Sequence, residues 1–286
     1  MDRKNYEKVM KFIFTLSALT SIVAIMLICI FIFAEGLPFI KNYGLKLFIL
    51  GNSWKPANSP PSFGILPMIL GSLYITIGAI ILGVPLGILT AIYMVQFANS
   101  RTRKILRLGV NLMAGIPSIV YGFFALTFLV PIIRNIFGGT GMNILTASIL
   151  LGIMILPTII TISEAAIRAV PNSYYLSSKA LGASHERTVA KVILPAAKSG
   201  ILSSIILGIG RAVGETMAVI LVTGNQARIP NNLFQGVRTL TTNIVIEMAY
   251  ASGIHRQALI ATALILFVFI LIINLCFFII KGRSLE

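Results

Sequence analysis

Long apolar runs separated by shorter polar segments dominate the chain. Six of the runs are long enough to cross a bilayer as helices, and they lie at about 12–34, 66–96, 108–133, 144–163, 200–223 and 258–280. Pro117 and Pro131 interrupt the third run, and we expect kinks there. The pattern therefore predicts an all-α polytopic membrane protein with six transmembrane helices.

The first apolar run follows a short basic leader, as in a secretory signal peptide. At 23 residues the run exceeds the apolar region of such a peptide, about 7–15 residues, so we interpret it as an uncleaved helix. The stretch after it, 35–65, contains Trp54, Pro56, Pro60 and Pro61, and we expect it to be irregular and to follow the membrane interface. We divide the chain into an N-terminal unit, 1–65, and a core domain of five spans, 66–281.

Composition supports the membrane assignment, and charge adds an orientation. Hydrophobic residues make up 57% of the chain and charged residues only 11%, compared with about 25% in soluble domains. The net charge of +15 would suggest nucleic acid in a soluble protein, but membrane proteins gather lysine and arginine on the cytoplasmic side. Placing both termini in the cytoplasm puts 15 of the 23 basic residues inside and seven outside. We therefore expect a multi-pass protein of the plasma membrane with both termini inside and no nucleic-acid partner.

The inner segment between the fourth and fifth runs has the signals of a helical hairpin. Pro171 suits a first helical turn, and Gly182 suits the left-handed residue that ends a helix. Ser184 can cap a second short helix, and Pro195 breaks the pattern before the fifth run. A solvated connector would have the same pattern, so the hairpin by itself assigns no role.

This hairpin, 171–195, resembles the cytoplasmic loop of binding-protein-dependent ABC importer permeases, where nine residues separate a glycine from I-x-L-P. Here nine residues separate Gly182 from V-I-L-P at 192–195, while Leu-Ser-Ser at 176–178 stands where the family has Glu-Ala-Ala. The resemblance implies a coupling helix that docks into an ATP-hydrolysing subunit. The implied coupling residues are Ser178, Ala180, Gly182, Ala183, Ser184, Leu194 and Pro195.

The chain has no G-x-x-x-x-G-K-[ST] sequence, the loop that cradles nucleotide phosphates. We therefore expect a transport subunit that is not an enzyme and binds no cofactor, with ATP and Mg²⁺ on a separate ATPase chain. No disulfide framework or metal site is expected either, because both cysteines fall in apolar runs.

The fifth run contains an arginine at depth, in the stretch GIGRAVGETMAVILVTG at 208–224. Arg211 is about twelve residues from either end of the run, or about 18 Å, which its side chain cannot span. Helical spacing puts Arg211 and Glu215 on a face of small residues, opposite a bulky apolar face. The two charges could form an i,i+4 ion pair or line a hydrophilic path, and these alternatives are compatible.

The stretch around Arg211 resembles the fifth span of one subgroup of the importer family, the phosphate-uptake permeases. The chain is similar to this subgroup over most of its length from residue 63 on, through the segments 63–93, 115–122 and 155–171. GETMAV at 214–219 and EMAYASGIHRQAL at 247–259 are similar to the PstC-type subunit of the pair of permeases.

This second resemblance implies a type I ABC importer permease fold and a role for Arg211, Glu215 and Thr216 in a path for inorganic phosphate. Guanidinium suits a phosphate oxyanion, because its planar fork donates two parallel hydrogen bonds. The implied partners are a homologous PstA-type permease, two ATPase subunits, an extracytoplasmic phosphate-binding protein and the lipid bilayer.

Two other functions fit the same residues. A stand-alone transporter coupled to protons or ions could use the Arg211–Glu215 pair as its relay. An ABC permease for another oxyanion, such as molybdate, sulfate or phosphonate, would also need a buried cation, since charge and geometry do not separate these ligands.

Overall fold

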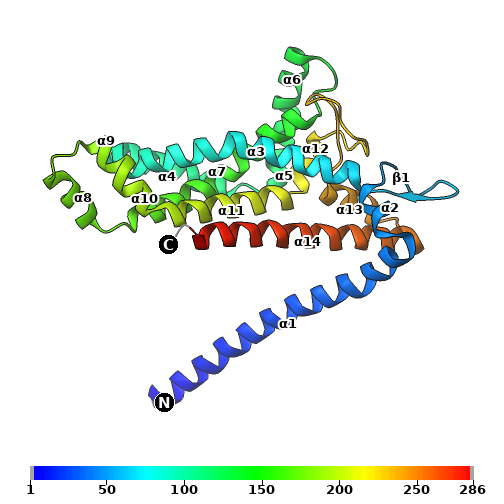
Figure 1. The fold of residues 1–286 in the computed structure, drawn as a ribbon, viewed down its shortest axis with the longest axis horizontal. Helices are drawn as coiled ribbons and strands as arrows, with labels where there is room; N and C mark the ends of the chain where they lie inside the picture. Colours follow the sequence, from blue (N-terminus) through cyan, green and yellow to red (C-terminus); the bar gives the residue numbers. More distant parts are fainter. Residues whose placement is uncertain (1–2, 284–286) are drawn as a thin grey trace.

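Two helices rich in small residues form the centre of the molecule. In the computed structural model, which describes residues 3–283, they are α3 (Leu66–Ile92) and α7 (Ile144–Arg168) (Figure 1). A Cβ atom added at Gly83 of α3 would lie 2.7 Å from the carbonyl oxygen of Gly152 in α7. Glycine at this crossing therefore allows the two backbones to approach closely, as is common between membrane helices.

Two more helices flank α7. α11 (Lys198–Gly214) packs along it, with a hydrogen bond of 2.8 Å between the hydroxyls of Ser204 and Ser163 and with Gly208 against Ile159. α4 (Ser100–Gly115) contacts it from another side. The long helix α14 (Gly253–Arg283) lies against α11 (Figure 1).

The first helix, α1 (Arg3–Tyr43), diverges from this bundle (Figure 1). Among the described residues, its later part contacts α14, and there the rings of Phe33 and Phe267 meet edge to face with centroids 6.2 Å apart. Gly36 lies against Leu264 in the same contact. The apolar side chains of its earlier part are exposed, which is the arrangement expected of a helix that lies in lipid.

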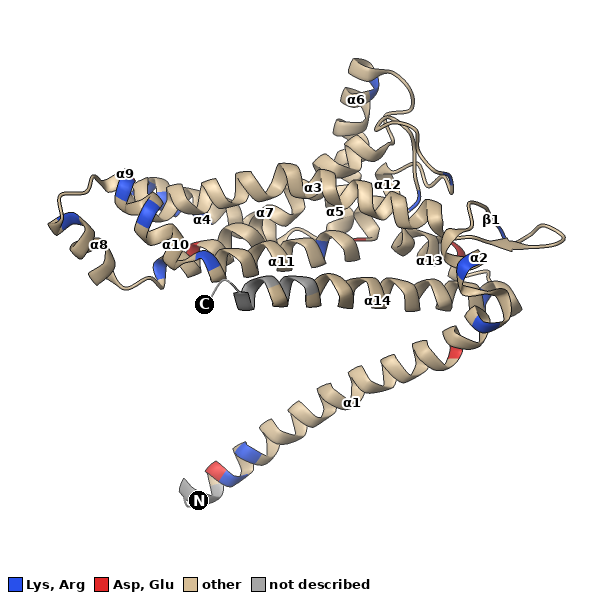
Figure 2. Cartoon of the chain, in the orientation of Figure 1, with Lys and Arg blue, Asp and Glu red and all other residues tan. Residues whose placement is uncertain are grey.

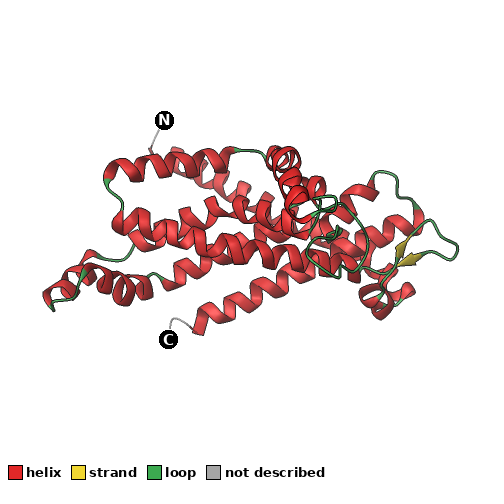
Figure 3. Cartoon of the chain, turned by 90° about the horizontal axis from the view of Figure 1, so that it is seen from above, coloured by secondary structure: helices red, strands yellow, loops and turns green. Residues whose placement is uncertain are grey.

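The remaining elements are short. Two antiparallel strands of two residues each form a β-hairpin, in which Trp54 pairs with Phe63 and Lys55 with Ser62 (Figure 3). The other short elements are α2 (Leu45–Leu50), β1 (Trp54–Lys55), β2 (Ser62–Phe63), α5 (Ser118–Phe124), α6 (Val130–Phe137), α8 (Asn172–Ala180), α9 (His185–Thr188), α10 (Leu194–Ala196), α12 (Met217–Val222), α13 (Leu240–Met248) and three π-helical turns, Tyr93–Phe97, Ala125–Leu129 and Val189–Ile193.

The predicted all-α polytopic architecture is confirmed. Among the described residues, five helices are long and apolar enough to cross a membrane. A sixth span is obtained when α11 is counted together with the adjoining segment His185–Ala196, which meets it at a bend of 68°.

The third span differs from the prediction. α4 is a separate helix that ends at Gly115, and the spanning helix runs over Ser118–Phe137 rather than 108–133. Pro117 precedes the first turn of the new helix, so the break falls there. Pro131 interrupts nothing, because the π-helical turn Ala125–Leu129 leads into α6.

The segment after the first span is also more ordered than predicted. Instead of an irregular stretch, 35–65 contains the end of α1, α2 and the β-hairpin. Four aromatic side chains explain this, because Phe39, Phe48, Trp54 and Phe63 are buried together in one cluster with α14. Burial of large aromatic rings stabilises the segment against the bundle.

Charge and chain ends mark one end of the molecule. The described starts and ends of the chain, in α1 and α14, lie at the same end as the α8–α9 hairpin (Figures 1 and 3). Lysine and arginine gather around α8, α9 and α10 and at the start of α1, whereas the long helices between the two ends are mostly uncharged (Figure 2). We call this the hairpin end, and the end that carries the β-hairpin the opposite end.

Candidate functional site

The fifth span is interrupted where the sequence places its two charges. α11 ends at Gly214, Glu215 is extended with φ −68° and ψ 133°, and α12 begins at Met217. The Glu215 carboxylate accepts hydrogen bonds from the backbone N–H groups of Thr216, at 3.1 Å, and of Ala218, at 3.2 Å. The carboxylate thus caps the short helix α12, whose first N–H groups would otherwise lack partners.

The ion pair that the i,i+4 spacing allows between Arg211 and Glu215 does not form. The i,i+4 spacing brings two side chains together only in a continuous helix, and this helix stops between them. Arg211 is half-buried and has no hydrogen bond or ion pair with any described residue. Its guanidinium is therefore free to meet a ligand.

Space is open beside Arg211. A Cβ atom added at Gly210 or at Gly214 would meet no heavy atom within 4 Å. Tyr121 of α5 lies within electrostatic range of the Arg211 guanidinium. The site is consequently a cation beside a gap in its own helix, with small residues on both sides.

A second interrupted helix faces this gap. α4 ends at Gly115 and α5 begins at Ser118, and the Tyr121 hydroxyl bridges the break by donating a 2.8 Å hydrogen bond to the carbonyl of Met113. α5 packs on α12 through Gly122, where a Cβ atom would lie 2.8 Å from the Cα of Ala218. Two broken helices therefore meet at the level of Arg211.

Thr216 completes this group, which we call the helix-break site: Tyr121, Arg211, Glu215 and Thr216. The Thr216 hydroxyl donates to the carbonyl of Gly214 at 3.3 Å, so it bonds back to its own chain. From the opposite end, the Thr241 hydroxyl of α13 donates to the Glu215 carbonyl at 3.0 Å. The break is thus held in place by two hydroxyls.

Sequence reasoning missed a buried carboxylate at the opposite end. Glu247 of α13 accepts hydrogen bonds from the Trp54 indole at 2.8 Å and from Arg238 at 2.5 Å, and it contacts His255 at 2.8 Å. We call these four residues the Glu247 network. The sequence around Glu247 does not indicate that its side chain is buried. Its partner Trp54 lies 193 residues away, so no local pattern joins the two.

The predicted turn and cap of the hairpin are confirmed in geometry. Gly182 has a φ of +82° between α8 and α9, and the Ser184 hydroxyl accepts from the Arg187 N–H at 3.2 Å. The hydroxyls of Ser178 and Thr188, 2.9 Å apart, brace the two arms. Hydrogen bonds therefore join the two arms of the hairpin to each other.

The hairpin is anchored to the bundle on one side and exposed at its tip. His185 lies 3.0 Å from the Gln96 carbonyl and 3.1 Å from the Tyr175 hydroxyl, whereas Leu181 at the turn is 89% exposed. Glu186 hydrogen-bonds its own backbone N–H and the Ser184 side chain, which lowers the pKa of this carboxyl below its ordinary value. An exposed apolar tip on a fixed base suits contact with another protein.

The other predicted coupling residues lie along the same hairpin. Ala180 ends α8, and the Ala183 N–H donates to the Ser178 carbonyl at 3.2 Å. Leu194 and Pro195 belong to α10, and the chain bends after it, at Ala197. The break expected at Pro195 thus falls two residues later, because proline fits the first turn of α10.

No metal centre is formed by the described residues, since they contain no group of three or more His, Cys, Asp or Glu side chains that could hold an ion. The groups that the helix-break site offers for binding are a guanidinium, a carboxylate and hydroxyls.

Comparison with known proteins identifies the family. The family described as "Binding-protein-dependent transport system inner membrane component" matches residues 83–284. The chain is 39% identical over 273 residues to the "Probable ABC transporter permease protein YqgH" of Bacillus subtilis, covering 92% of this chain and 88% of the relative. It is 34% identical to the "Probable phosphate transport system permease protein PstC" of Methanocaldococcus jannaschii, covering 86% and 84%. The protein of Mesorhizobium japonicum named "Phosphate transport system permease protein PstC" is 33% identical, with 84% and 79% covered.

Solved structures share the fold. A chain of a bacterial ABC transporter involved in the import of the acidic polysaccharide alginate superposes with a TM-score of 0.65 at 16% identity, covering 98% of this chain and 99% of that one. A chain of the MetNI methionine ABC transporter gives 0.59 at 21% identity, covering 77% and 94%. The chain therefore belongs to the family of binding-protein-dependent transport system inner membrane components, and its fold is that of an ABC importer permease.

Proposed function

We propose that this chain is the PstC-type permease subunit of an ATP-driven ABC importer for inorganic phosphate. One observation carries the proposal: Arg211 presents an unpaired guanidinium at a gap between helix segments, in a chain whose relatives include proteins named PstC. A cation at the depth of the membrane is costly unless it serves a ligand or a path. Its planar fork matches the oxygen atoms of a phosphate.

Glu215 has a distinct role in this proposal. Its carboxylate is held by the N–H groups of α12 and not by Arg211, so it does not compete directly for the guanidinium. It still lowers the local positive potential, which keeps the binding of an anion weak enough for release. A path needs such a balance, because a site that binds too tightly does not conduct.

The hairpin end would lie in the cytoplasm, with both termini, and the opposite end would receive phosphate from a binding protein. This orientation follows the excess of lysine and arginine at the hairpin end (Figure 2). The exposed tip at Leu181 would dock on one of two ATPase subunits, and a homologous PstA-type permease would line the other half of the path. The location would be the plasma membrane.

A single helix, α11, connects the hairpin to the helix-break site. Beyond the bend at Ala197, α11 runs for 17 residues, about 25 Å, and carries Arg211 in its last turn. Movement of the hairpin on the ATPase would thus reach Arg211 with little loss, because a helix resists compression more than a loop does. ATP and Mg²⁺ would be held by the ATPase chains.

The test is uptake of ³²P-phosphate by the complete transporter in proteoliposomes with ATP inside. Arg211→Ala should reduce uptake to background while both permeases and the ATPase still copurify, and Arg211→Lys should restore only part, because an ammonium lacks the fork. Arg101→Ala, at an exposed arginine in the first turn of α4, is the matched control and should transport normally.

Three results would overturn the proposal. Normal uptake by an assembled Arg211→Ala variant would remove Arg211 from the path. Uptake driven by an ion gradient after ATP depletion would favour a stand-alone transporter. Transport of sulfate or molybdate in preference to phosphate would change the substrate.

A further inference from the structure

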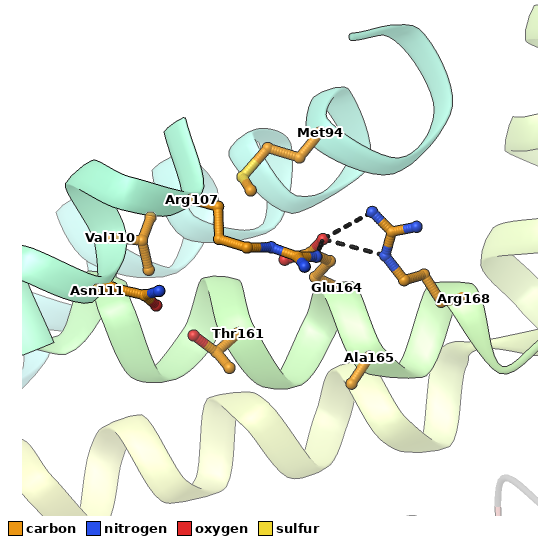
Figure 4. Close-up of a pocket in the computed structure, with 8 residues that line it drawn as sticks. All are labelled: Met94, Arg107, Val110, Asn111, Thr161, Glu164, Ala165 and Arg168. Atoms are coloured by element: carbon orange, nitrogen blue, oxygen red, sulfur yellow. Dashed lines mark hydrogen bonds and ion pairs between the residues drawn. The ribbon is translucent and has the colours of Figure 1, made fainter. Parts of the chain in front are cut away.

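A second group of arginines lies nearer the hairpin end and has no role in the proposal above. Arg107 of α4 and Arg168 of α7 both bind the carboxylate of Glu164, and the three side chains border a cavity of about 310 Å³ (Figure 4). We call these three residues the inner arginine cluster. In the sequence, Glu164 directly follows the fourth apolar run, 144–163.

The bonds inside the cluster leave most of its donors unused. Glu164 accepts through one oxygen, Oε1, from Arg107 Nη2 and from Arg168 Nε at 3.0 Å and Nη2 at 2.8 Å. An arginine has five N–H donors, so this carboxylate occupies three of the ten that the pair provides. One carboxylate also balances only one of the two positive charges.

Exposure separates the cations from their counter-ion. The side chain of Glu164 is 8% exposed, whereas those of Arg107 and Arg168 are 52% and 39% exposed. The Glu164 carboxylate therefore lies beneath the two guanidinium groups, whose unused N–H donors are available to the cavity. Among the residues drawn in Figure 4, Thr161 and Asn111 add a hydroxyl and an amide to the lining.

The cavity lies on the inner side of the helix-break site. Ile159 of α7 packs against Gly208 of α11, and Arg211 is three residues farther from the hairpin end than Gly208. Glu164 is five residues nearer that end than Ile159. At 1.5 Å per residue, the cluster lies about 12 Å farther in along the bundle axis.

Polar or open positions continue between the two sites. On α4, Arg107 and Asn111 are one turn apart and both line the cavity, and the next turn ends at Gly115, which has open space beside it. On α7, Thr161, Ala165 and Arg168 are exposed at helical spacing on one face. An anion leaving Arg211 toward the hairpin end would meet these positions.

We propose that Arg107 and Arg168 form a second binding station for a phosphate oxyanion, through which transported phosphate leaves the path. This station rests on the proposed function and adds to it. Glu164 holds both guanidiniums in place when the station is empty. It competes with the incoming anion for the same donors, so that phosphate binds weakly and departs.

Binding is tested without transport by footprinting arginines in the assembled transporter. Phenylglyoxal modifies free guanidinium groups, and mass spectrometry resolves each site. In nanodiscs of phosphatidylcholine, inorganic phosphate should protect Arg107 and Arg168 from modification, whereas the exposed Arg101 should react at the same rate with and without phosphate. Sodium chloride at equal ionic strength should not protect any of the three.

Glu164→Gln sharpens this test. Removing the competing charge should lower the phosphate concentration for half-protection of Arg168 several-fold, because the amide neutralises neither guanidinium. A cluster that is only structural would show no dependence on phosphate in either form. This binding readout also separates the two proposals, since it does not require that uptake occur.

Transport gives the second readout. Arg168→Gln should lower the maximal rate of phosphate uptake several-fold with little change in KM, because capture takes place upstream at Arg211. Arg168→Lys, which keeps the charge, should recover part of the rate and shows that the chain has assembled.

Two results would overturn the inference. The first is equal modification of Arg107 and Arg168 with and without phosphate. The second is protection that appears only when phosphatidylglycerol is added, which would assign the arginines to a lipid headgroup. Failure of wild-type uptake would instead count against the importer proposal, whatever the footprint.

Discussion

Two buried carboxylates, one toward each end of the bundle, show how the same residue type can be structural or available. Glu247 uses both oxygens, and its partners Arg238 and His255 are only 16% and 15% exposed. Glu164 uses one oxygen, and its two arginines are 52% and 39% exposed. The first arrangement is closed, and the second leaves cations facing a cavity.

The difference lies in what each carboxylate connects. Glu247 joins the β-hairpin, α13 and the start of α14, and it does so through residues far apart in the chain. Arg238 also donates to the carbonyl of Asn225 at 3.0 Å, which extends the network toward α12. Glu164 joins only α4 and α7. Loss of Glu247 should therefore affect stability, whereas loss of Glu164 should affect ligand binding.

Glu247→Gln should have the largest effect on stability. It leaves Arg238 without its charged partner in a nearly closed site, and breaking a buried ion pair costs about 3–5 kcal/mol. The measurement is the midpoint of thermal unfolding of the assembled transporter. Should the midpoint stay unchanged while the transporter remains assembled, the network is not structural.

Trp54→Phe should have an intermediate effect. The ring remains in its aromatic cluster, but the hydrogen bond from the indole to the charged Glu247 is lost, at a cost of about 1.5–3 kcal/mol. Limited proteolysis of the segment 51–65 provides the readout. Faster cleavage is expected there, and an unchanged rate would show that the aromatic contacts alone hold the segment.

Glu164→Gln should have a small effect on the same thermal midpoint. Its arginines can hydrate when the carboxylate is lost, and ion pairs with exposed partners contribute about 0–1 kcal/mol. This variant is the matched control for Glu247→Gln. A destabilisation as large as that of Glu247→Gln would make the inner cluster structural and would remove the contrast.

Tyr250→Phe should have the smallest effect on stability, and the effect should appear at alkaline pH. Tyr250 is 67% exposed, but partial desolvation, with the nearby Glu247 charge as the second cause, still raises the pKa of its phenol above the ordinary value. The folded protein thus favours the neutral phenol, a contribution that is complete below about pH 10 and is lost as the pH rises through the raised pKa. Tyr250→Phe should lessen the alkaline loss of stability, whereas Tyr174→Phe in α8 is the control. Identical alkaline profiles for wild type and Tyr250→Phe would contradict this.

The sequence predicts the regular parts of the fold well, because apolar length and small residues are local properties. The second and fourth runs, 66–96 and 144–163, correspond closely to α3 with its π-helical turn and to α7. The α8–α9 hairpin is equally predictable, because Gly182 indicates a turn and Ser184 a helix cap within a few residues of each other.

The break in the fifth span was missed although a local signal exists. A carboxylate three residues before a free N–H can cap a helix, as Glu215 does for Ala218. The apolar run through 200–223 suggested continuity and hid that signal. The two carboxylate networks depend instead on tertiary contacts, such as that of Arg107 with Glu164, which are 57 residues apart. Spacing along one chain does not reveal such contacts.

Hydrogen bonds hold both ends of the short helix α12 in place. Its beginning is tied to α13 by Thr241, and its end is tied by the Asn225 amide, which donates to the Ile220 carbonyl at 2.7 Å. The short helix is therefore linked to the opposite end, whereas α11 continues from the hairpin. Arg211 and Glu215, neighbours in the sequence, sit on opposite sides of a joint. In the proposed function, a displacement of one side of this break relative to the other would change the distance between the two charges and hence the affinity for an anion.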